Sequence, residues 1–113
     1  MRRILFAASA AACVMLVPAG MAHAEECVLE APAPTVPDGA TATAEQVEAT
    51  KQSILAFQKA LAPYRECLNG IMDNTELEKE VRQAALDKFN ASVDEESALV
   101  ESWQKMMSAY NAR

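Results

Sequence analysis

Histidine is almost absent from this sequence, which carries one, His23, among its 113 residues. That residue lies in an N-terminal segment that we expect to be removed on export. A serine nucleophile of the Ser-His type needs an imidazole to take its proton, and two cysteines alone do not complete a metal site. We therefore expect no catalytic residue, no metal and no cofactor in the rest of the chain, and predict that the protein is not an enzyme.

Long apolar runs are missing beyond the first 24 residues, so we expect no membrane span there. The early run at 4–17 follows two arginines and is closed by Ala-His-Ala at 22–24. This order of parts is typical of a secretory signal peptide with an A-x-A cleavage site. We predict that residues 1–24 are removed and that the protein is periplasmic or secreted. One alternative is that the segment stays uncleaved as an N-terminal anchor. The other is lipidation of Cys13, which the missing leucine at its −3 position disfavours.

Positive charge is scarce in the remainder, where 8 Lys and Arg stand against 16 Asp and Glu, a net charge of −8. An acidic surface repels phosphate backbones and anionic lipid, so we expect no nucleic-acid partner and no membrane binding after signal cleavage. The acidic groups, such as residues 94–96, fit a solvated helix face, with weak binding of divalent cations as a distant alternative.

Only two cysteines, Cys27 and Cys67, follow the signal segment. An even pair in an oxidising compartment indicates a disulfide, and the pair lacks the close C-x-x-C spacing of a redox-active site. A domain this small buries a thin core and benefits from such a covalent link. We predict a structural Cys27–Cys67 bridge, which the chain-entropy account values at roughly 4 kcal/mol.

Proline and glycine divide the remaining chain into an arm and two helices. Residues 25–42 carry three prolines and predict an extended arm. A capping box at Thr43 begins a helix over 43–68, which Asn69-Gly70 should end and Pro63 should bend. Its core positions, spaced as in a coiled coil, are Val47, Ile54, Phe57, Leu61, Tyr64 and Leu68.

A second capping box at Thr75 predicts a helix over 75–111. Its expected apolar stripe runs through Leu77, Val81, Ala85, Phe89, Val93, Val100, Trp103, Met107 and Tyr110, flanked by Leu86, Leu99 and Met106. The short connection makes the helices antiparallel. The expected fold over 43–113 is thus an all-α, coiled-coil-like two-helix hairpin. An extended arm, tethered by the disulfide, would run back along the first helix and bury Val28, Leu29 and Val36.

The end of the second helix is the candidate interaction surface. With these bounds that helix is about ten residues longer than the first, so its last turns would overhang. An exposed apolar cluster must be covered or used. We favour cover by the arm and keep binding of a partner or a second copy as the alternative. The cluster consists of Trp103, Met106, Met107 and Tyr110.

The sequence resembles an uncharacterised family of small exported α-helical proteins of Gram-negative bacteria. The resemblance rests on the run APAPTVPDGA at 31–40 and on Tyr-Arg-Glu-Cys-Leu at 64–68. It implies export and a helical fold, and it carries over no catalytic residue. We expect a non-catalytic module that binds a protein partner or forms a homodimer. The alternative is a periplasmic carrier of a small ligand or metal ion.

Overall fold

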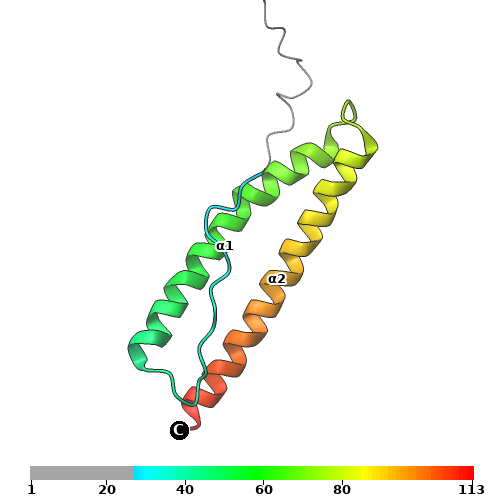
Figure 1. Ribbon diagram of the computed structural model, residues 1–113. Coiled ribbons are helices and arrows are strands. Elements are labelled where there is room, and N and C mark those ends of the chain that lie inside the picture. Colours follow the sequence, from blue (N-terminus) through cyan, green and yellow to red (C-terminus); the bar gives the residue numbers. More distant parts are fainter. Residues whose placement is uncertain (1–26) are drawn as a thin grey trace, which may run out of the picture.

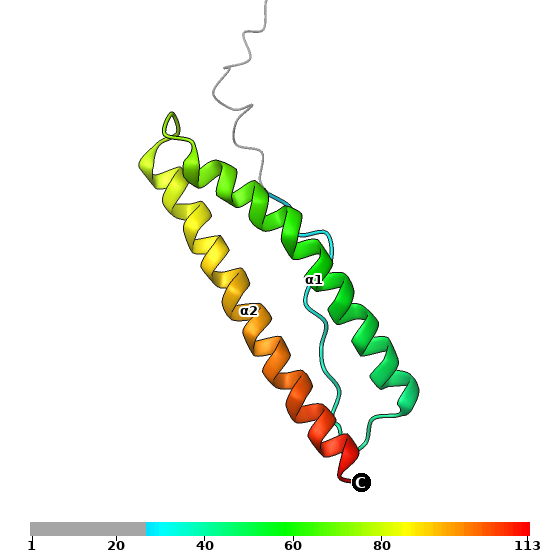
Figure 2. The ribbon, with the colours of Figure 1, turned by 180° about the vertical axis from the view of Figure 1, so that it is seen from behind.

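Two long antiparallel helices form the protein, and an extended arm lies between them on one face (Figures 1 and 2). The computed structural model describes residues 27–113, and the predicted signal peptide lies outside them. Helix α1 spans Ala44–Asp73, helix α2 spans Lys79–Asn111, and no strand occurs within this described part. The predicted all-α hairpin with a tethered arm is confirmed.

Helix α1 begins as predicted but ends later. The Thr43 hydroxyl accepts a hydrogen bond from the amide of Gln46, and the Gln46 side chain accepts one from the amide of Thr43. The expected end at residue 68 is wrong, because the helix continues through Gly70 to Asp73. A glycine inside a helix costs only about 1 kcal/mol, so Gly70 is tolerated within α1. Pro63 stays inside the helix, and α1 changes direction in its C-terminal part (Figure 1).

Helix α2 begins at Lys79 and not at residue 75. The side chain of Asn74 accepts a hydrogen bond from the amide of Glu76, and its carbonyl accepts one from the amide of Leu77. Asparagine thus closes a local turn, a conformation that competes with a helix start at Thr75. The first residue outside α2 is Glu78, whose side chain makes no capping hydrogen bond.

The arm covers the core of the hairpin on one face. Leu29, Ala33 and Val36 pack against a buried cluster formed by Ile54, Phe57, Leu61 and Leu99. The predicted burial of Val28 is wrong, since its side chain is 71% exposed. Asp38 turns the chain into α1, where its carbonyl accepts from the amides of Thr41 and Ala42.

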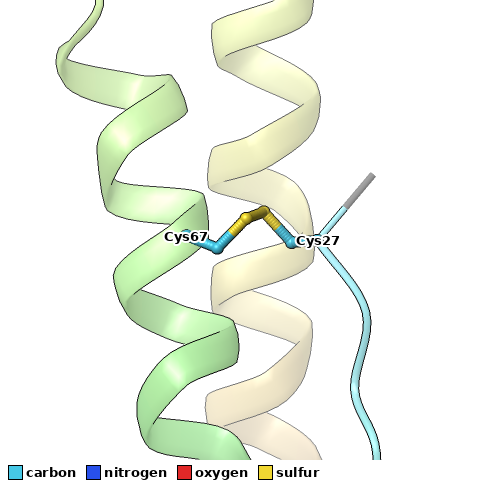
Figure 3. The surroundings of a disulfide bond; sticks show 2 residues. All are labelled: Cys27 and Cys67. Carbon is cyan, nitrogen blue, oxygen red and sulfur yellow. A yellow bond between two sulfur atoms is a disulfide. The ribbon is translucent and has the colours of Figure 1, made fainter. Parts of the chain in front are cut away.

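A disulfide joins the start of the arm to α1, as predicted (Figure 3). Cys27 and Cys67 have Cα atoms 5.7 Å apart, although 40 positions separate them in sequence. Because Cys67 lies near the end of α1, the arm must run back along most of that helix to reach it. The arm is therefore held at one end by a covalent bond and at the other by the Asp38 turn.

Candidate functional site

The four residues of the predicted interaction surface lie near the C-terminal end of α2 and differ in exposure. Met106 is buried beside the arm, while Trp103, Met107 and Tyr110 are half-buried. Trp103 packs against the core cluster, and the guanidinium of Arg113 lies 4.5 Å from the centre of the Tyr110 ring. Whether any of them binds a partner stays a prediction.

The expected overhang is also absent, because α1 has 30 residues and α2 has 33. The residues at the end of the arm pack against the C-terminal end of α2. Gly39 lies so close to α2 that a β-carbon on it would overlap the Met106 carbonyl oxygen. A guanidinium nitrogen of Arg113 donates to the carbonyl of Ala40 at 3.3 Å. This end of the hairpin, for which we favoured cover by the arm, is therefore packed against the arm.

An exposed apolar column runs along α2 on the side away from the arm. Leu86, Val93 and Val100 recur every seventh residue and are 39%, 41% and 36% exposed. In a helix, this spacing places them above one another. Met107 continues the column and is half-buried. The predicted stripe included Val93 and Val100 in the core, and that assignment is wrong.

The residues of α2 that face the core of the hairpin form a neighbouring column, in which each residue directly precedes a residue of the exposed column. Ala85, Ser92, Leu99 and Met106 are all buried. Two of these side chains, Ala85 and Ser92, are small. This choice of register leaves the larger Leu and Val side chains of the next column at the surface.

A polar cluster holds this register in the middle of the hairpin. Arg65 of α1 donates to the hydroxyl and the carbonyl of Ser92 at 3.0 and 3.1 Å, and to Glu96 at 3.1 Å. Its guanidinium lies 5.9 Å from the centre of the Phe89 ring. Any shift of α2 along α1 would break these bonds, so the cluster specifies one alignment. Sequence reasoning assigned Glu96 to a solvated acidic helix face and missed its partner Arg65.

A hollow on the side away from the arm continues the exposed column onto α1. It has a volume of about 260 Å³, and its walls are Lys51, Ile54, Leu55, Gln58, Val100 and Trp103. Leu55 is 49% exposed beside it. We call the surface made of Leu55, Leu86, Val93, Val100 and Trp103 the open face. In a two-helix hairpin this is where a third helix would pack.

A second cleft, of about 450 Å³, lies between the arm and α2. Its walls include Ala33, Val36 and Pro37 of the arm. Helix α2 contributes Glu95, Ala98, Leu99, Ser102, Lys105, Met106 and Ala109. Apolar side chains and both signs of charge meet there, a mixture that can hold a small amphipathic molecule.

Comparison of the chain with family models, with curated proteins and with solved structures finds no match. Neither helix of the described chain is long and apolar enough to cross a membrane. Within residues 27–113, His, Cys, Asp and Glu nowhere gather in threes that could hold a metal ion.

Proposed function

We propose that this protein is an exported, non-catalytic interaction module that binds another protein through the open face. The observation that carries the proposal is the exposed column of Leu86, Val93 and Val100 beside a hollow in the hairpin. Apolar residues at a seven-residue spacing are the anchors with which one helix binds another. Complete burial of a fully exposed side chain of this kind contributes roughly 1.5–3 kcal/mol. Because these three are 36–41% exposed, a partner would gain a part of that from each.

The arm supports the choice of face. It occupies one side of the hairpin and is fixed there by the Cys27–Cys67 disulfide. The opposite side can accept a further helix without displacing the arm. The disulfide also supports export, because such bonds persist in oxidising compartments.

Site-specific photocross-linking tests this proposal in the cells that naturally make the protein. A photoreactive residue at Val93 should give a defined cross-linked species, which the added substitution Val100→Asp should abolish. The control position is Ala91, which is exposed and lies on the opposite side of α2, about 200° around the helix. Equal cross-linking from both positions, or none from Val93, would contradict the proposal. A cross-linked dimer would identify self-association.

The arm cleft favours a second candidate function, the carrier of a small amphipathic ligand. A bulky side chain at Ala98, which lines this cleft, should fill it and leave the open face unchanged. An Ala98→Phe substitution that removes a bound cellular metabolite, detected by native mass spectrometry, would favour the carrier. A protein that is recovered without any such ligand would count against it.

A further inference from the structure

We infer that the open face binds an amphipathic helix of another protein, with Lys or Arg along one edge of its apolar stripe. This inference rests on the proposed function and adds the chemistry of the partner. Its basis is the pattern of charge that borders the exposed column on α2.

An acidic column runs beside the apolar one over residues 80–101 of α2. Glu80, Asp87, Asp94 and Glu101 recur every seventh residue, and all four are exposed. Between the two columns lie uncharged polar residues, at Gln83, Asn90, Ser97 and Gln104. Moving around α2 from the hairpin core, a partner therefore meets apolar, then neutral polar, then acidic side chains.

Within residues 27–113, no Lys or Arg nitrogen lies within 4.0 Å of a carboxylate of this column. The one salt bridge among residues 27–113 joins Arg65 to Glu96, away from it. Asp87 accepts a hydrogen bond from Gln83, which carries no charge. Two carboxylates one column step apart are separated by about 10.5 Å, so their mutual repulsion persists at low salt. Lysine or arginine on a partner would remove that repulsion while lying along the apolar surface.

The edge of the open face that α1 forms is not acidic, unlike the edge that α2 forms. Lys51 and Gln58 line the hollow there, and no carboxylate does. A partner with basic residues on both edges would bring one row against Lys51. The surface therefore fits a helix whose basic residues lie on one edge only, which also fixes the orientation of the bound helix.

A second copy of the chain fits the face poorly. Residues 27–113 contain 8 Lys and Arg against 14 Asp and Glu. The exposed apolar column of a second copy would bring its own acidic column with it. Like charges facing one another across an interface disfavour association.

The column from Leu86 to Met107 is about 32 Å long, so a partner helix of about three heptads covers it.

Titration with designed helical peptides tests the inference. One 21-residue peptide carries a leucine stripe with lysines on one edge, and a matched peptide has glutamate at each lysine position. The emission of Trp103, the single tryptophan of the protein, reports binding. The lysine peptide should bind about tenfold more tightly or better. Asp94→Asn should weaken it roughly two- to fivefold, and less at high salt.

The matched control is Glu95→Gln, which removes the same charge from the next residue. Glu95 lines the arm cleft and not the open face, so this variant should bind the lysine peptide like the wild type. Equal weakening by Asp94→Asn and Glu95→Gln would overturn the inference, because the attraction would be to net charge alone. Equal binding of both peptides would overturn it and leave the proposed function standing. Absence of binding by either peptide counts against the cationic helix if Val93 still cross-links, and against both proposals if it does not.

Discussion

Replacement of Gly39 by alanine should loosen the arm from the hairpin. A β-carbon at this position would overlap the carbonyl oxygen of Met106 and lie 2.9 Å from the amide nitrogen of Tyr110. These are backbone atoms of α2, so no side chain can rotate away to make room. The backbone of Gly39 does not have a positive φ angle. The cost of the substitution therefore comes from the contact and not from a conformation that alanine cannot adopt.

The size of the effect follows from two opposing contributions. Overpacking at a site that cannot relax costs roughly 1–3 kcal/mol. Loss of glycine reduces the conformational entropy of the unfolded chain and returns about 0.4–1 kcal/mol. We expect a net loss of about 1–2 kcal/mol in the free energy of unfolding. For a domain of this size each kcal/mol corresponds to a change of roughly 4–8 °C in Tm.

Gly70 provides the matched control, because a β-carbon there would meet nothing within 4 Å. It lies inside α1, where alanine is favoured over glycine by about 0.5–1 kcal/mol. Thermal unfolding followed by circular dichroism should show a lower Tm for Gly39→Ala and a higher one for Gly70→Ala. A Gly39→Ala variant as stable as wild type would refute the close packing of the arm on α2.

Three further results are expected. Cys67→Ser should lower the free energy of unfolding by roughly 4 kcal/mol, and an unchanged Tm with and without reductant would show that the bridge does not hold the arm. Arg65→Lys keeps the charge but loses the two bonds to Ser92, so urea unfolding should show a loss of about 1–2 kcal/mol, whereas no loss would contradict the register role of the cluster. Intact mass of the exported protein should correspond to a chain that begins at Glu25, and a mass that retains residues 1–24 would contradict signal cleavage.

Much of α1 and of the arm could be predicted because each depends on local chemistry. Thr43 and Gln46 satisfy each other across one turn, and Phe57, Leu61 and Leu68 are large apolar residues that are fully buried. The disulfide followed from an even pair of cysteines in a chain predicted to be exported. None of these features requires knowledge of how the second helix is aligned.

The register of α2 could not be predicted because hydrophobicity favours the wrong column. Val93 is more apolar than the adjacent Ser92, yet Ser92 is buried and Val93 is 41% exposed. Its burial depends on the bonds that Arg65 makes from 27 residues away. The open face escaped prediction for the same reason. The sequence contains two neighbouring columns of residues with seven-residue spacing, one that begins at Ala85 and one that begins at Leu86. Only one of the two columns can face α1, so the other must lie at the surface.

Mapping of the peptide contact by nuclear magnetic resonance tests the central claim most directly. Amide chemical shifts of the protein would be followed while the lysine-edged helical peptide is added. We predict changes at Leu86, Val93, Val100 and Leu55, with the arm residues 32–38 unaffected. Changes confined to the arm and to the α2 residues that line its cleft would show that the arm side, and not the open face, is the binding surface.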